Sequence, residues 1–589
     1  MTIDIERVYI TAEIGDINEL RQLLDNERYS KTSISHAVNK TYETDDHIFV
    51  TSLGIAALNG HLQCVNFLID ECFADINGAD SVDQKIYYSP LWCAVTSGNM
   101  PVIKSLLSRG ADVNVVNTDN GETPLSAACF HNNFNIVKFL IENYNADVEF
   151  TTNSDGRTYL MSACRLGHAE TVKYLVENCN VNLNKADKNH CTALHHATKS
   201  DSLKIVKCLA ENGAKLNVVD LFRNTPLSNA IIYESNDITH YLLPLVDERE
   251  KINGLELLGA IYVAKEMYVS AILHWKYALL ERLKSKYTKS TYHSSSMAII
   301  FNSVPEFRTD EELEKMLSNT TNPYDILVQA LLIIDRILGS QNRYTANYTK
   351  LIADKFEITT SMKLLMYCAN IERNEKCFSD KCLYTFIKLQ NLLCKGIKTI
   401  DDKEEIIDHL LAVLRVGVNY IGTGIISKVE KRENFKEIYN FDDLLVIHTQ
   451  ILAMIFTPSI KPFLNNQQYA SVKELVRYLV NLNPKTISTG DTLLHLTCEG
   501  NNICDAVKVP NVKVIQLLRE VGADLSAKNH EGNTPYLTFE KCYKNNYFAD
   551  SMTDDDLLAI VGILTNNVSS QKKRNNDDKD YAIVKRKKK

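Results

Sequence analysis

The chain contains 589 residues, of which 45% are hydrophobic and 23% charged, and its formal net charge is −8 at pH 7. This composition is ordinary for a folded soluble protein, and the negative charge argues against general affinity for nucleic acid. The apolar runs are too short to cross a membrane, since residues 409–426 contain Arg415 and several glycines, and the acidic N-terminus lacks the apolar core of a secretory signal.

The N-terminal segment, 1–40, keeps only half of a pattern that recurs further along the chain. Ala12, Gly15 and Leu20 fit the second part of that pattern, whereas its Thr-Pro-Leu opening is missing. The terminal repeat of a stacked array is often atypical because its outer face meets water. We therefore expect a degenerate first repeat here, followed by a regular repeat that opens at Thr51 and ends near Asn77.

A four-residue opening of the Thr-Pro-Leu-His type then recurs at a nearly constant interval. The openings begin at Ser89, Thr123, Thr158, Thr192 and Thr225. Each is followed by a small residue, a segment similar to Val-Lys-x-Leu and an exit similar to Gly-Ala-Asp-Val-Asn. A period of about 33 residues with this lettering predicts ankyrin repeats. These repeats extend to about Leu243.

Physical chemistry explains this lettering. The Thr hydroxyl is expected to cap the first helix of each repeat, and proline suits the next position, where no N–H is needed. Gly110 and Gly213 are placed to end second helices in a left-handed turn. A single repeat cannot bury its own apolar face, so neighbours must stack, and the concave surface of turn tips and first-helix residues usually binds another protein.

The step from Thr51 to Ser89 is longer than the steps that follow it. The extra residues belong to a segment predicted to form an extended finger, which contains Asp83, Tyr87 and Tyr88. A finger at the edge of a stack is a favoured place for binding, and a tolerated loop insertion is the alternative explanation.

From about residue 246 the pattern changes. Six residues match the spacing of a tetratricopeptide helix pair: Leu258, Gly259, Tyr262, Ala271, Trp275 and Ala278. Apolar residues recur at helical spacing from Glu311 to Leu338, and residues 350–480 contain further helices without a clear repeat. The segment 422–428 is rich in glycine but lacks the spacing of a phosphate-binding loop, so no phosphate site is predicted there.

An ankyrin pattern returns late in the chain, with openings at Thr492 and Thr534 and a final helix over 554–564. The predicted fold is therefore all-α, with two ankyrin stacks on either side of a helical middle. Its predicted parts are N-terminal ankyrin repeats (1–245), a tetratricopeptide-like helical segment (246–345), a helical linker region (346–482), C-terminal ankyrin repeats (483–565) and a disordered basic tail (566–589). Residues 572–589 carry a net charge of +6, which resembles a two-part nuclear import signal, with a merely solvated tail as the alternative. The expected localisation is cytoplasmic, and nuclear if the tail is used.

The order of these parts resembles the Fem (feminization) homologue family over roughly residues 5 to 565. The most specific stretches are Pro90-Leu91-Trp92, the run from Thr123 to Phe130, and the Leu-Glu-Leu-Leu-Gly-Ala element at 255–260. The resemblance implies a non-enzymatic substrate receptor of a cullin–elongin ubiquitin ligase, whose ankyrin groove captures short protein C-terminal degrons, typically with arginine near the chain end. Elongin and cullin subunits are the implied partners. A plain ankyrin scaffold is the alternative, because the family's C-terminal elongin and cullin box is not visible after Leu564.

The resemblance also suggests a peptide-binding site. Its candidates are aromatic residues for packing and polar residues for selection: Tyr87, Tyr88, Trp92, Asp83, Ser126 and His131. His131 stands where the family usually has an aspartate that holds the degron arginine. A neutral imidazole cannot replace the carboxylate of such a pair, which is worth about 1.5–3 kcal/mol. Asp83, Asp119 and Glu122 are alternative carboxylates, and the preference for arginine is left open.

No catalytic group, cofactor or metal site is predicted. His190, Cys191, His195 and His196 are close in sequence, which would suit zinc, but their offset differs from that of the family's metal-binding pair. His195 is interpreted as the ordinary ankyrin histidine that bonds the turn. The fifteen cysteines form no Cys-x-x-Cys pair. Those within repeats are predicted to be buried, reduced thiols, as in the cytosol or nucleus: Cys64, Cys129, Cys164 and Cys208.

Overall fold

The computed structural model describes most of the chain and divides into two compact units. The described residues are 3–25, 28–44, 49–78, 88–117, 121–151, 155–285, 295–301, 304–318, 323–372, 380–400, 403–428, 435–457, 459–486, 488–499, 510–544 and 552–565. Unit 1 comprises Met1–Gly259 and Leu273–Lys289, and unit 2 comprises Ala260–Ile272 and Ser290–Lys589. Within the described ranges, every helix is too short or too polar to span a lipid bilayer.

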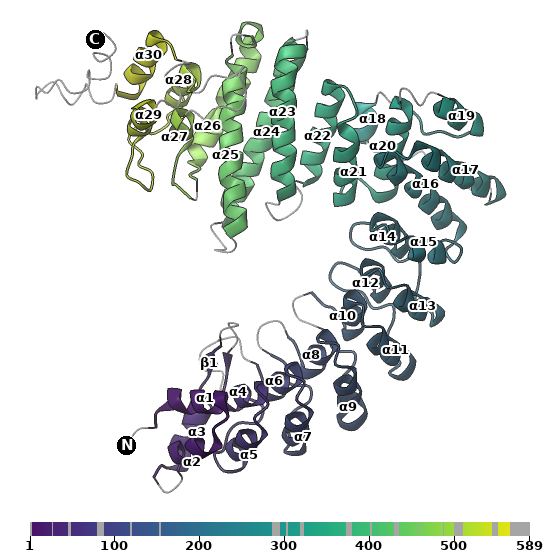
Figure 1. Ribbon diagram of the computed structural model, residues 1–589. Coiled ribbons are helices and arrows are strands. Elements are labelled where there is room, and N and C mark those ends of the chain that lie inside the picture. The colour runs from purple at the N-terminus through teal and green to yellow at the C-terminus, as the bar shows by residue number, and fades with distance from the viewer. Residues whose placement is uncertain are drawn as a thin grey trace, which may run out of the picture. The chain divides into compact units, whose positions relative to one another are not determined.

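Unit 1 begins with a stack of helical hairpins (Figure 1). Its first helices are α1 (Ile5–Ile14), α4 (Ser52–Leu58), α6 (Pro90–Thr96), α8 (Pro124–Phe130), α10 (Tyr159–Leu166), α12 (Ala193–Lys199) and α14 (Pro226–Ile232). Their partners are α2 (Ile17–Leu23), α5 (Leu62–Asp70), α7 (Met100–Ser108), α9 (Phe134–Tyr144), α11 (Ala169–Asn178), α13 (Leu203–Glu211) and α15 (Asn236–Leu242). An extra helix, α3 (Lys31–Val38), and a short antiparallel pair, β1 (Tyr42–Glu43) and β2 (Phe49–Val50), follow the first hairpin.

The hairpins pack as the sequence period predicts. First helices contact first helices, from α4 against α6 to α12 against α14, and second helices contact second helices, as α11 does with α13. One apolar core runs through the hairpins from Val8 in α1 to Tyr159 in α10. Since no single hairpin encloses this core, the stack is held together by the contacts between neighbouring repeats. The predicted ankyrin arrangement is therefore confirmed for this part of the chain.

The predicted caps are also present. The Thr123 hydroxyl accepts the N–H of Ser126 at 3.2 Å, and the Ser126 hydroxyl accepts the N–H of Thr123 at 2.9 Å, with Pro124 in the first turn. Gly110 and Gly213 both have a φ of 92°, a left-handed conformation that glycine adopts without steric cost. These residues fix where helices begin and end, and hence the repeat length.

Side chains at the turn tips join each repeat to the next. Asn77 Oδ1 accepts the N–H of Asp112 at 2.7 Å, and Asn114 Oδ1 accepts the N–H of Asp147 at 2.9 Å. Asn184 does the same for Lys215 at 2.8 Å. The last letter of the Gly-Ala-Asp-Val-Asn exit is thus a link between repeats, which explains why asparagine suits that position.

Two longer helices follow the hairpins, α16 (Glu248–Ala264) and α17 (Tyr268–Ser285). Trp275 is fully buried, and its indole N–H donates to the carbonyl of Glu256 at 3.0 Å. The Glu256 carboxylate is also buried and pairs with Arg282. The predicted helix pair is present, while its assignment as a tetratricopeptide unit stays a prediction.

Unit 2 continues with a series of helices. They are α18 (Ser295–Ile300), α19 (Asp310–Ser318), α20 (Tyr324–Leu338), α21 (Arg343–Ala353), α22 (Ile358–Glu372), α23 (Asp380–Thr399), α24 (Lys403–Lys428), α25 (Phe435–Ile455), η1 (Lys461–Phe463) and α26 (Asn466–Leu482). The predicted stretch 311–338 is thus two helices, α19 and α20. Residues 422–428 belong to α24, so this glycine-rich segment is helical and forms no phosphate-binding loop.

The late ankyrin pattern forms two more hairpins. Its helices are α27 (Leu493–Glu499), α28 (Val512–Glu520), α29 (Pro535–Lys544) and α30 (Asp554–Thr565). As in unit 1, first helices pack together (α27 with α29), and so do second helices (α28 with α30). The predicted basic tail, 566–589, lies outside the described residues.

Candidate functional site

The predicted peptide-binding residues are only partly within the described ranges. Asp83 and Tyr87 of the predicted finger lie outside them, as does the alternative carboxylate Asp119. Tyr88, Trp92, Ser126 and His131 are described and belong to the repeats that open at Ser89 and Thr123. Their first helices, α6 and α8, are packed against each other.

Trp92 lies in the first turn of α6, where the Ser89 hydroxyl accepts its backbone N–H at 3.1 Å. Its ring is half-buried and contacts the ring of Tyr88, with centroids 4.3 Å apart. Its indole N–H is buried and has no acceptor among the described residues. Tyr88 itself is only 7% exposed, so it supports Trp92 from the core.

Ser126 occupies the same place in α8 as Trp92 does in α6, three residues after the capping residue. Its hydroxyl donates its proton to the Thr123 carbonyl at 2.7 Å, in addition to accepting the Thr123 N–H. Because a hydroxyl has one proton, only a lone pair is left for a ligand. Ser126 can therefore accept a hydrogen bond from a peptide N–H without disturbing the cap.

His131 is exposed and follows α8 as its C-terminal cap, with its ring edge-on to Phe130 at 5.3 Å. Residues four apart share a helix face, so Phe130, and not His131, lies on the face of Ser126. Phe130 is 52% exposed, although it is a large apolar residue. The sequence interpretation missed Phe130, and its spacing from Ser126 is the signal that would have identified it.

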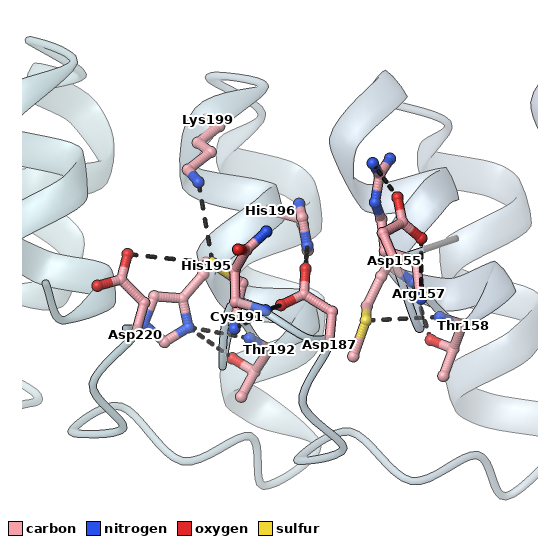
Figure 2. Close-up of polar contacts among 12 residues, drawn as sticks. Asp155, Arg157, Thr158, Asp187, Cys191, Thr192, His195, His196, Lys199 and Asp220 are labelled. Carbon is pink, nitrogen blue, oxygen red and sulfur yellow. Dashed lines mark hydrogen bonds and ion pairs between the residues drawn. The ribbon is translucent and has the colours of Figure 1, made fainter. Parts of the chain in front are cut away.

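A second cluster of polar side chains lies at the turn before α12 (Figure 2). His195 Nδ1 accepts the N–H of Thr192 at 3.1 Å, and its Nε2 N–H donates to the carbonyl of Asn224 in the next repeat at 3.1 Å. Burial lowers the pKa of His195 to about 4, so the ring is neutral. The prediction that His195 bonds the turn is confirmed.

The neighbouring His196 faces another group. Its Nε2 N–H donates to Asp187 Oδ2 at 3.0 Å, and candidate ligand atoms of Asp187, Cys191 and His196 all lie within 4.8 Å of one another. Each of the three residues is no more than 5% exposed. Of the four residues considered for zinc, only Cys191 and His196 belong to this group, since His195 is engaged in the turn and His190 is exposed. Asp187 was missed, because its spacing alone indicates only a turn residue.

Burial and hydrogen bonding set the charges in this group. Burial raises the pKa of the Cys191 thiol to about 11. Burial alone would also raise the pKa of Asp187, but hydrogen bonds from His196 and from the N–H groups of Cys191 and Asn189 outweigh it, so this pKa lies below its ordinary value. Burial lowers the pKa of His196. Near neutral pH the group therefore holds a carboxylate, a thiol and a neutral imidazole.

Comparison with known proteins agrees with this architecture. The family model for ankyrin repeats (3 copies) matches residues 8–117, 91–187 and 178–253. The chain is 27% identical over 544 residues to protein fem-1 homolog A-A of Mus musculus, covering 82% of this chain and 81% of that protein. It is 28% identical over 542 residues to protein fem-1 homolog A of Bos taurus, and 28% identical over 555 residues to protein fem-1 homolog CG6966 of Drosophila melanogaster, with the same coverage in both cases. The chain thus has ankyrin repeats, which indicate a protein-interaction surface, and it is similar to Fem-1 homologues over about four fifths of its length.

Proposed function

We propose that this protein is the substrate-recognition subunit of a cullin-type ubiquitin ligase, which captures the C-terminal peptide of another protein on the ankyrin repeats of unit 1. The observation that carries the proposal is the match to Fem-1 homologues over about four fifths of both chains. In this role the protein binds and presents a client, and partner subunits carry out the transfer of ubiquitin.

The peptide would lie across α6 and α8. The half-buried face of Trp92 and the exposed ring of Phe130 offer apolar surface for an aliphatic or aromatic side chain. Ser126 lies between them in the repeat order, and its lone pair can orient a peptide N–H. Aromatic residues of this kind typically supply most of the energy in a small interface.

The selectivity of the site would depend on residue 131. An exposed imidazole at the end of α8 gives a guanidinium no carboxylate to pair with, so this position by itself does not favour peptides that end in arginine. Glu122, which directly precedes the capping Thr123, is another carboxylate close to α8 in the sequence. The proposal therefore places shape selection at Trp92 and Phe130 and leaves charge selection to be measured.

An array of peptides that represent protein C-termini tests the capture step. Wild-type protein should retain a subset that shares a terminal motif, and Trp92→Ala should weaken retention at least tenfold, about 1.4 kcal/mol. Phe73→Ala removes an exposed aromatic ring elsewhere in unit 1 and should not change retention. Equal retention by the Trp92 and Phe73 variants, with both folded by circular dichroism, would contradict the site.

A charge swap tests the selectivity. His131→Asp should shift the retained set toward arginine-ended peptides, because it restores a carboxylate at the end of α8. His131→Asn is the matched control, since asparagine has the same shape as aspartate but carries no charge. If both variants keep the wild-type selectivity, residue 131 does not contact the peptide.

Purification from cells under gentle conditions tests the ligase step separately. We expect elongin and a cullin among the partners in stoichiometric amounts. Their absence, combined with intact peptide capture, would leave an ankyrin scaffold without a ligase and would remove this half of the proposal.

A further inference from the structure

We propose that Asp187, Cys191 and His196 form a binding site for a divalent transition metal ion, best suited to zinc, with Asp220 of the next repeat as the fourth ligand. The site lies inside unit 1, at the turn that leads into α12 (Figure 2). It is independent of the peptide-binding residues and of any ligase partner.

The donor atoms already lie close to a coordination shell. Zinc takes carboxylate oxygen, imidazole nitrogen and thiolate sulfur at about 2.0–2.3 Å, so the ligands of a tetrahedral site lie about 3.3–3.8 Å apart. His196 Nε2 and Asp187 Oδ2 are 3.0 Å apart, and Cys191 Sγ lies 4.0 Å from Asp220 Oδ2. The ligand atoms of Asp187, Cys191 and His196 all lie within 4.8 Å of one another, so small side-chain rotations would bring these three into a shell, whereas Asp220 lies outside this group and would need a larger rotation.

The protein holds the first of these ligands in place. Asp187 Oδ1 accepts the N–H of Cys191 at 2.9 Å and the N–H of Asn189 at 2.8 Å. These bonds orient the carboxylate so that its other oxygen faces His196. Asp220 is fixed in the same way by the N–H groups of Phe222 and Asn224. Backbone donors that orient ligating carboxylates are a regular feature of protein metal sites.

The fold of the turn does not require Cys191 or His196, two of the four proposed ligands. In other repeats, too, a side-chain oxygen accepts the backbone N–H of the residue that precedes the capping threonine. The oxygen belongs to Asp220, Thr486 or Asn529. In those repeats the place of Cys191 is taken by Asn224, Asp491 and Asn533. The place of His196 is taken by Asn229, Leu496 and Thr538. Ordinary turn geometry thus explains Asp187 but not the thiol and the imidazole beside it.

The protein alone also leaves this cluster incompletely satisfied. The Cys191 sulfur has only long contacts, to Asp220 and to Lys199 Nζ at 3.9 Å. Buried polar groups in folded proteins usually have good partners, so such a cluster points to a ligand that the chain does not itself supply.

The charges suit a divalent ion. With Cys191 deprotonated, the four ligands carry three negative charges and a neutral imidazole, which exceeds the charge of Zn²⁺ by one. Lys199 lies beside the sulfur and can balance that remaining charge. The mixed sulfur, nitrogen and oxygen set favours zinc over magnesium or calcium, which prefer oxygen alone.

Metal binding to the full-length chain tests this inference. After removal of metal with a chelator, we expect one equivalent of Zn²⁺ to bind and to raise the unfolding midpoint. Co²⁺, used as a probe, should give a thiolate-to-metal absorption band and the visible spectrum of a tetrahedral ion. Cys191→Ser and His196→Leu should each weaken binding by about 100-fold, while Cys164→Ser, at a buried thiol in α10, should have no effect.

His196→Leu keeps the experiment decisive if the cysteine variant does not fold, because leucine occupies this place in the late repeat. Failure of the wild-type chain to bind one equivalent, or binding that survives in both ligand variants, would overturn the site. Asp220→Asn should weaken binding about tenfold. An unchanged affinity in that variant would overturn its assignment as the fourth ligand.

Discussion

The repeat that opens at Thr192 and the repeat that opens at Thr492 lie in different units but build the same turn. His195 Nδ1 accepts the N–H of Thr192 at 3.1 Å, and His495 Nδ1 accepts the N–H of Thr492 at 3.2 Å. The Nε2 atom of each bonds a carbonyl of the next repeat, at 3.1 Å for His195 and 3.0 Å for His495. The same letters therefore produce the same contacts in two distant parts of the chain.

The two repeats differ one residue further along the helix. His196 is buried and bonded to Asp187, whereas Leu496 is buried and has an apolar side chain that cannot form such a bond. The thiol of Cys191 has Asp491 as its counterpart. The shared histidine belongs to the fold, and the residues that differ are free to carry a function of their own, which is the basis for the proposed metal site.

The largest effect is expected from removing the turn histidine that the two repeats share. His195→Ala and His495→Ala should each lower the free energy of unfolding of their own unit by roughly 2–4 kcal/mol, because each removes two buried hydrogen bonds and leaves a cavity. Hydrogen exchange of amides in α12 and α27 would measure the two effects separately. A large effect at one histidine and none at the other would show that the turns are not equivalent.

The next largest effect is expected from exchanging the residues that differ between the repeats, His196 and Leu496. Leu496→His should cost roughly 2–3 kcal/mol, because the ring would be buried where Thr489 and Asn529 already occupy the Asp491 carboxylate. His196→Leu should lower the stability of the metal-free chain by about 1–3 kcal/mol, since it leaves Asp187 Oδ2 buried without its partner. Urea unfolding of the two variants gives both numbers, and a Leu496→His variant as stable as the wild type would argue against this difference between the repeats.

The sequence predicts the structure well wherever a residue has a single local structural role. The spacing of Thr123 and Thr225, the glycines Gly110 and Gly213, and the turn histidine His195 all predicted contacts that the structure contains. Each of these depends on local geometry, which a repeat pattern states directly.

The candidate sites were harder to predict, because they depend on side chains brought together by packing. Asp187 and Asp220 belong to successive repeats, and Asp220 meets Cys191 only when those two repeats stack. Tyr88 was predicted in an extended finger at the edge of the stack but is buried against the core, since the chain there has already rejoined the stack. The break between α19 and α20 was missed, because apolar spacing is similar on both sides of it.

A third buried histidine, His448, should make the stability of unit 2 depend on pH. His448 in α25 uses one ring nitrogen, bonded to the Leu444 carbonyl at 2.6 Å, whereas His195 and His495 use both. Burial lowers the pKa of His448 to about 4, against about 6.5 in the unfolded chain.

The unfolded state therefore takes up a proton first as the pH falls. The contribution of His448 to stability is complete above about pH 6.5, declines below it, and is reduced by roughly 2 kcal/mol at pH 5. Unfolding of unit 2 measured between pH 7.5 and 5 should show this loss, and His448→Leu should reduce it. An identical pH slope in the variant would mean that other groups account for the acid sensitivity.

The smallest effect concerns the links between repeats. Asn114 joins its repeat to the next by accepting the N–H of Asp147, and Ser526 holds the corresponding place after Asp524 in the late repeat. Asn114→Ser should convert the early exit into the late form and cost about 1 kcal/mol, because one partly exposed hydrogen bond between repeats is lost. Asn143→Ala is the control, since that side chain bonds only the Phe139 carbonyl of its own helix, and it should cost no more than about 0.5 kcal/mol. If both variants cost the same in thermal unfolding, the asparagine links do not contribute to the coupling between repeats, and stacking of the apolar core alone holds the early array together.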